Sequence, residues 1–254
     1  MKMNFNTMRE KLKQNFLSLL LVLSLVMPGI SLSQTTTQKT GWFCNRIPEI
    51  ENRIKERITN YQTRLEERRQ ERLNRLENWR NQREARRQEN RAKWDANRQE
   101  HFEKLRAKAQ NDTQKQAIEK FIETVQTAIS VRRSKIDSVV LSFKQAVDQA
   151  IANRQSAINT AITEYKNSID SAFEKAKSDC ANGVDPKMVR ETLLSSLKSA
   201  REKLRNDIAN IEKLKDSIQA EAEKKRETIR AAIDEFHATV EKAREELKSA
   251  LQGQ

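Results

Sequence analysis

Arginine gathers in one part of the chain, residues 64–106, and two tryptophans lie among the arginines. A guanidinium group binds phosphate or carboxylate through two parallel hydrogen bonds, and an aromatic ring offers a face on which a base can stack. This combination indicates a surface for a polyanion. The candidate contact residues are Trp79, Arg80, Arg83, Arg87, Arg91 and Trp94.

The same stretch also contains many glutamates, which favour a second interpretation. Glu71 precedes Arg75 by four residues and Glu89 precedes Lys93 by four, in the order that stabilises a helix surface. Each such pair contributes only about 0.2–0.5 kcal/mol, but a dozen can hold a weakly packed helix together. No RNP motif or zinc finger accompanies the arginines. We therefore favour a solvated helix reinforced by its own charges over a nucleic-acid module.

Other residue types that carry chemistry are scarce. His101 and His237 are the only histidines, and two imidazoles without a neighbouring cysteine or a recognised carboxylate spacing are weak evidence for a metal. The HExxH, GxSxG and Walker patterns are absent, and 4 glycines leave few of the tight turns that such sites use. The sequence predicts no catalytic residue, no cofactor and no metal, and therefore no enzyme.

The two cysteines, Cys44 and Cys180, are far apart in sequence and form no CxxC pattern. Disulfides persist in exported proteins, and two isolated thiols cannot make a zinc site. A bond between Cys44 and Cys180 is therefore the favoured prediction. Two free thiols, or one bridge between chains, are the alternatives.

The composition dictates what kind of element can position these residues. Of 254 residues, 33% are charged and 36% hydrophobic, with only 4 Gly and 3 Pro, so the chain can make few reversals. Few reversals and periodic apolar residues predict an all-α fold of long helices. The net charge of +13 favours an anionic partner, either a cell-surface polymer, a lipid or a nucleic acid, and it also suits an acidic client protein. Charge alone does not rank these partners, and it leaves self-association open.

The N-terminus has the pattern of a secretory signal. A basic stretch precedes the apolar run 16–26, and small residues at Ser31 and Ser33 fit a cleavage site. We expect residues 1–33 to be a signal peptide and 34–44 a polar linker. The product would be exported to the periplasm, the cell surface or the medium, or it would stay membrane-anchored if the signal is not cleaved.

Helix boundaries can be placed from capping residues. Asn45 is an acceptable N-cap with Pro48 in the first turn, and Asp185 followed by Pro186 begins a later helix after Gly183. A further break is expected near residue 111, where Thr113 and Gln116 fit a capping box. The alternative is one uninterrupted helix over about residues 45–178.

These breaks divide residues 45–254 into three helices at about 45–110, 113–179 and 185–252. The equal lengths, about 65 residues or 100 Å each, predict a long antiparallel three-helix coiled-coil bundle with up-down-up topology. Cys44 and Cys180 then meet at the same end. In the uninterrupted helix they would lie at opposite ends.

Two segments, AQNDTQKQAIEKF (109–121) and CANGVDPKMVRETL (180–193), resemble segments of uncharacterised exported helical (coiled-coil) proteins of candidate-phylum, Parcubacteria-type bacteria. That resemblance implies the breaks near 111 and 183 but no activity. The arginine- and glutamine-rich composition is also similar to that of periplasmic holdase chaperones of the Spy class, although their LTxxQ motif is absent here. We expect an exported, non-catalytic structural or interaction protein of the cell envelope, with an ATP-independent holdase or a polyanion binder as alternatives.

Overall fold

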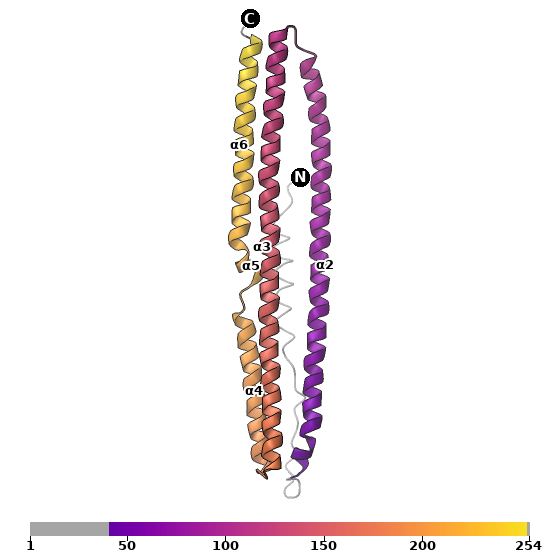
Figure 1. Cartoon of the computed structure of the whole chain (residues 1–254), viewed down its shortest axis with the longest axis vertical. Helices are drawn as coiled ribbons and strands as arrows, with labels where there is room; N and C mark the ends of the chain where they lie inside the picture. Colours follow the sequence, from indigo (N-terminus) through magenta and orange to yellow (C-terminus); the bar gives the residue numbers. More distant parts are fainter. Residues whose placement is uncertain (1–40, 253–254) are drawn as a thin grey trace, which may run out of the picture. The chain divides into compact units, whose positions relative to one another are not determined.

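The computed structural model describes residues 41–252, in which every regular element is a helix. The helices are α2 (Trp42–Arg106), α3 (Asp112–Ala181), α4 (Pro186–Asn210), α5 (Leu214–Ser217) and α6 (Gln219–Gln252). In Figure 1, α3 lies between α2 on one side and α4 and α6 on the other. The all-α prediction is confirmed for these residues. The expected signal peptide and most of the expected linker lie outside the described residues.

The first helix begins earlier than its capping residues predicted. Its N-cap is Gly41, and the backbone N–H of Asn45 donates to the Gly41 carbonyl at 3.3 Å, inside the helix. The prediction of Asn45 as N-cap was therefore wrong. Pro48 lies within α2, where its missing N–H leaves the Cys44 carbonyl without the usual helical donor. This extra turn carries Cys44 into the helix.

The chain turns between α2 and α3 at residues 107–111, so the uninterrupted helix is excluded. Asn111 is the N-cap of α3, and its side chain accepts a hydrogen bond from the Gln114 N–H at 2.9 Å. The Gln114 side chain in turn accepts from the Gln110 N–H at 2.9 Å. The two bonds resemble a capping box, except that the second donor is Gln110, the residue before the N-cap. A capping box was expected two residues later, at Thr113 and Gln116, and that placement was wrong.

The turn between α3 and α4 follows its sequence signals closely. Gly183 adopts a left-handed conformation with φ of 75°, which a residue with a Cβ rarely accepts. The Val184 N–H reaches back to the Asp179 carbonyl at 3.0 Å and the Gly183 N–H to the Cys180 carbonyl at 3.2 Å, the bonds of a Schellman motif. Asp185 then caps α4 by accepting from the Lys187 N–H at 2.8 Å.

The third helix is not continuous, contrary to the expected single helix over 185–252. α4 ends at Asn210, and α5 and α6 follow only after an extended residue at Ile211. Arg154 of α3 stabilises this break, because its guanidinium donates to the carbonyls of Ile211 and Glu212 at 3.3 and 2.5 Å. A cation at a helix C-terminus satisfies carbonyls that have no helical donor.

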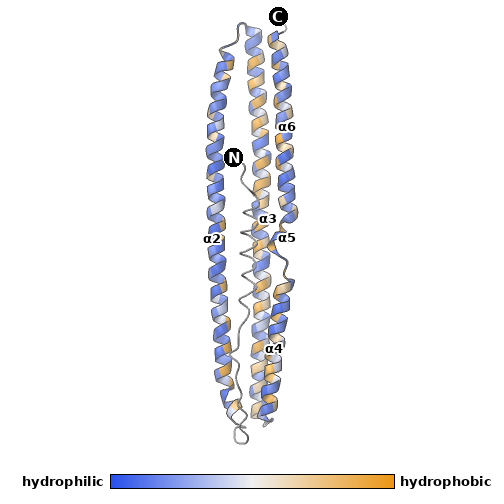
Figure 2. Ribbon diagram, turned by 180° about the vertical axis from the view of Figure 1, so that it is seen from behind, coloured by the Kyte–Doolittle hydropathy of each residue, from blue (hydrophilic) through white to orange (hydrophobic). Residues whose placement is uncertain are grey.

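Apolar side chains gather mainly near the two turns. Beside the α3–α4 turn, the buried residues from three helices are Ile47, Ile58, Ile169, Phe173, Val189, Leu193 and Leu197. Beside the α2–α3 turn, they are Phe102, Ile118, Ile122, Val125, Ile129 and Leu247. Between Ile58 and Phe102, α2 has no buried residue. Figure 2 agrees, since α2 is mostly hydrophilic and α3 carries more hydrophobic positions.

A charged interface between α2 and α3

Polar pairs join α2 to α3 along most of their length, including the stretch between Ile58 and Phe102 where α2 has no buried residue. Six of them share one register: Glu51–Lys177 (2.7 Å), Arg69–Asn159 (2.8 Å), Arg80–Asp148 (2.8 Å), Glu84–Lys144 (4.0 Å), Arg91–Asp137 (2.7 Å) and Asp95–Arg133 (2.6 Å). The pairs Lys55–Asp170, Arg87–Asp137 and Arg106–Glu119 also cross the interface, offset from that register by three or four residues. In the six pairs of one register, the match is regular. Each step forward along α2 is matched by an equal step backward along α3. The two helices therefore run in opposite directions in one constant register.

Two of these contacts, both between an arginine of α2 and an aspartate of α3, are 11 residues apart. Arg80 and Arg91 are 11 apart on α2, and their partners Asp148 and Asp137 are 11 apart on α3. Eleven residues make three turns of about 3.67 residues, close to the natural period of a straight helix. Successive pairs therefore fall nearly on one line along each helix.

Three of the four arginines proposed as polyanion contacts take part in this interface. Arg91 donates to both oxygens of Asp137, Arg87 lies 3.2 Å from the same carboxylate, and Arg80 pairs with Asp148. Their side chains are 18–27% exposed. The hydrogen bond from Arg91 holds the pKa of Asp137 below its usual value. These guanidinium groups already hold carboxylates of their own chain.

The remaining candidates are more accessible. Arg83 stacks over Trp79, with 4.5 Å between guanidinium carbon and ring centroid. Trp79 is 43% exposed and Trp94 is 60% exposed. The structure thus divides the predicted surface into a paired set that faces α3 and an exposed set that includes both tryptophans.

Asp95 anchors the part of the interface closest to the α2–α3 turn. It accepts two hydrogen bonds from Arg133 of α3, at 2.9 and 2.6 Å, and a third from Arg98 at 2.7 Å. The Arg133 hydrogen bonds, together with Arg98, lower the pKa of Asp95 to about 2, because they stabilise the charged form more than burial penalises it. This carboxylate stays charged over nearly the whole pH range.

The opposite end is closed by the predicted disulfide, which is confirmed. Cys44 and Cys180 are joined, with their Cα atoms 5.9 Å apart. Glu51 lies nearby and is 5% exposed. Burial would raise the pKa of Glu51, but hydrogen bonds from Lys177 and Lys55 outweigh it and lower the pKa. A covalent bond and a buried, fully paired carboxylate thus fasten α2 to the last turns of α3.

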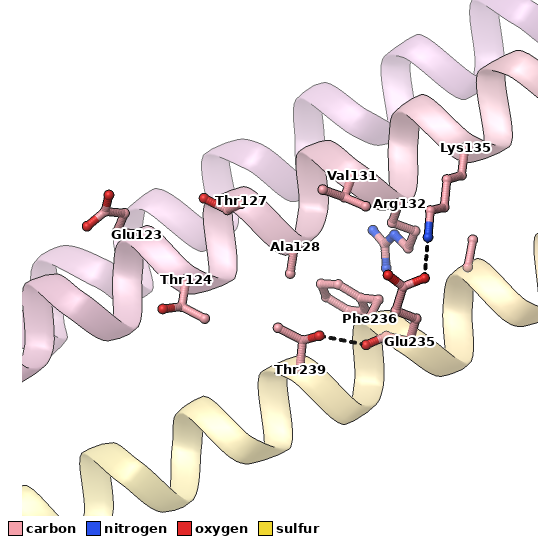
Figure 3. A pocket seen from close by; sticks show the side chains of 11 residues that line it. Glu123, Thr124, Thr127, Ala128, Val131, Arg132, Lys135, Glu235, Phe236 and Thr239 are labelled. Atoms are coloured by element: carbon pink, nitrogen blue, oxygen red, sulfur yellow. Dashed lines mark hydrogen bonds and ion pairs between the residues drawn. The ribbon is translucent and has the colours of Figure 1, made fainter.

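A shallow hollow of about 320 Å³ lies between α3 and α6. Figure 3 shows Arg132 beside Phe236, and Lys135 of α3 paired with Glu235 of α6. The facing residues Ala128 and Ala232 are small, so the gap marks incomplete packing more than a preformed ligand site. Threonines supply most of its remaining polar groups.

Among residues 41–252, no three His, Cys, Asp or Glu side chains are grouped so that they could hold a metal ion. In the same residues, no helix combines the length and apolar character needed to cross a bilayer. No family model, no curated protein and no solved structure matches the chain.

Proposed function

We propose that the protein is an exported, non-catalytic structural or interaction protein of the cell envelope. Its core would be an antiparallel three-helix bundle, a coiled coil with an 11-residue repeat, tied by the disulfide and presenting a basic helical surface. The observation that carries this proposal is the constant register between α2 and α3, from Glu51–Lys177 to Asp95–Arg133. The charged residues of this interface pair with one another and hold α2 and α3 in register.

Such an arrangement suits a spacer, because paired long helices resist bending better than one. The 70 residues of α3 correspond to a length of about 105 Å. Small-angle X-ray scattering of the oxidised protein should give a maximum dimension of at least that length and a rod-like cross-section. A globular profile would reject the spacer function.

A pull-down from envelope extract at low and high salt tests the interaction function. A basic surface predicts partners that bind at low salt and elute at high salt. Partners that stay bound at high salt would point to apolar recognition instead. If no specific partner is recovered at either salt concentration, the interaction function is rejected and only the spacer function is retained.

A holdase chaperone is the second candidate, and exposed apolar side chains favour it. Leu141 is 56% exposed, Leu194 49% and Met188 61%. A holdase would suppress the thermal aggregation of a denatured client without ATP, at stoichiometric amounts. Replacing these three residues with Gln should then abolish suppression, whereas no suppression by the unaltered protein rejects the idea.

A further inference from the structure

Three cations lie over aromatic rings along the middle of the bundle. Arg83 lies over Trp79 within α2 at 4.5 Å, and Lys225 of α6 lies over Phe143 of α3 at 3.7 Å. The third pair, Arg132 of α3 over Phe236 of α6, is 4.0 Å apart and is visible in Figure 3. A cation on a ring face keeps its charge while its surroundings lose water.

The positions on α3 fall on one line. Arg132, Phe143 and Arg154 follow one another at intervals of 11 residues, so they share a helix face, and successive positions are about 16 Å apart. Lys225 of α6 joins this line over the Phe143 ring, and Arg83 and Arg72 of α2 are near enough to Lys225 and Arg154, respectively, for the like charges to repel. We call the set the basic line: Arg72, Arg83, Arg132, Arg154 and Lys225.

The basic line lies between α2 and the later helices. Arg132 contacts α6 through Phe236 and is close enough to Arg98 and Arg91 of α2 to be repelled by them. Arg154 holds the chain after α4 and repels Arg72 of α2. No Cα of α2 is within 8 Å of a Cα of α6 in the described residues. The backbones of α2 and α6 are therefore not in close contact over α3.

Charge is not balanced along this line. Within residues 41–252, no member of the basic line is paired with a carboxylate, unlike Arg80, Arg91 and Arg133 next to it. Burial, and then neighbouring cations, lower the pKa of Arg132 and of Lys225. Partly desolvated like charges cost free energy that a bound anion would offset.

We propose that the basic line binds a linear phosphate polymer without bases, extended along α3. The line from Arg132 to Arg154 spans about 33 Å, so only an extended anion reaches all of it. Guanidinium groups bind phosphate oxygens bidentately. The inference rests on the proposed function, since it names the partner of the basic surface.

Two observations favour this ligand over others. The cation over each ring occupies a face on which a base would otherwise stack. An acidic amphipathic helix would need a continuous apolar stripe on α3, but arginine occupies two of the three positions, Arg132 and Arg154. Recognition therefore depends on charge along an extended chain.

The test measures binding of long-chain inorganic polyphosphate to the oxidised full chain at about 0.15 M salt. The variant Arg83→Gln, Arg132→Gln, Lys225→Gln should bind at least about 10-fold more weakly, with a salt slope flattened by about 0.7 for each lost contact. The control Arg205→Gln, Arg230→Gln, Lys248→Gln removes the same charge from exposed positions. It should change affinity by less than about 2-fold, because those positions are not on the basic line.

Two further comparisons vary the length and the chemical class of the anionic ligand. Tripolyphosphate, too short to bridge two positions, should bind at least about 10-fold more weakly than the long polymer at equal phosphate concentration. A single-stranded oligonucleotide that binds 10-fold more tightly than polyphosphate would overturn the base-free ligand. Tighter binding to anionic vesicles would assign the surface to a membrane instead.

Folding of the variants is checked by circular-dichroism melts. If the triple variant unfolds, Lys225→Gln alone, at a half-buried side chain, should still weaken binding about 3-fold. Equal losses in the triple variant and its control, or no binding by the unaltered protein, would overturn the inference. A rod-like scattering profile would then still support the spacer function.

Discussion

Arg91 of α2 donates hydrogen bonds to both carboxylate oxygens of Asp137 of α3, at 2.9 and 2.7 Å. One 11-residue step away on each helix, Arg80 and Asp148 repeat the pair. Because the pairs repeat at an equal interval on both helices, they fix the register of α2 against α3. A slip of one residue would misplace every pair at once, whereas leucine contacts tolerate small shifts.

A charge swap at Arg80 and Asp148 tests this role. Asp148→Arg alone would place two cations together and should cost about 1 kcal/mol or more, given the partial exposure of the pair. Adding Arg80→Asp should recover at least half of that loss, which urea unfolding can measure. Failure of the double variant to recover would mean that the pair does not fix register. Asp234→Arg on exposed α6 is the control.

Stability should fall at acid pH. The pKa of Asp95 is 3.8 in an ordinary chain and about 2 here, so the folded state binds fewer protons between those values. Its stabilising effect is present above pH 4 and is lost as pH falls toward 2. The α2 amides near Asp95 should therefore lose protection from hydrogen exchange as the pH falls from 4 to 2. Asp95→Asn should weaken that acid dependence.

Reduction of the disulfide should destabilise the protein. The bond joins residues 136 apart in sequence, and removing it should cost about 2–5 kcal/mol through the greater freedom of the unfolded chain. The double variant Cys44→Ser, Cys180→Ser should show the same loss and no response to reductant. Equal melting temperatures with and without reductant in the unaltered protein would contradict this role.

Proline should distinguish the break after α4 from the interior of α3. Lys213 has φ of −71°, which proline also adopts, so Lys213→Pro should cost less than about 1 kcal/mol. Ile151→Pro, in the middle of α3, should cost about 3 kcal/mol or more. Circular-dichroism melts compare the two. Similar damage at both positions would argue that residues 211–213 are helical in solution.

The helix boundaries with strong capping residues could be predicted, and the others could not. Gly183, Asp185 and Pro186 are local signals, and the turn between α3 and α4 lies at these residues. The break after Asn210 has no glycine or proline, and it depends on Arg154, which is distant in sequence. A tertiary contact of this kind gives no signal in the sequence around the helix end.

The charged interface had a signal that apolar periodicity does not detect. Arg69, Arg80 and Arg91 repeat at 11 residues, as do Asn159, Asp148 and Asp137 in reverse order. The sequence interpretation placed these arginines in solvent and therefore did not connect the 11-residue spacing on α2 with that on α3. The basic line was not predicted either, because Arg132 approaches α2 only after the chain has turned once, and Lys225 only after it has turned twice.

The disulfide also determines how the protein would carry mechanical load. Cys44 lies near the start of α2, and Cys180 lies one residue before the end of α3. A pull applied at residue 41 and at residue 252 would pass through the sulfur bridge directly into α4. The two longest helices would bear no tension, and about 460 Å of potential extension would stay locked within the loop until the bond is reduced.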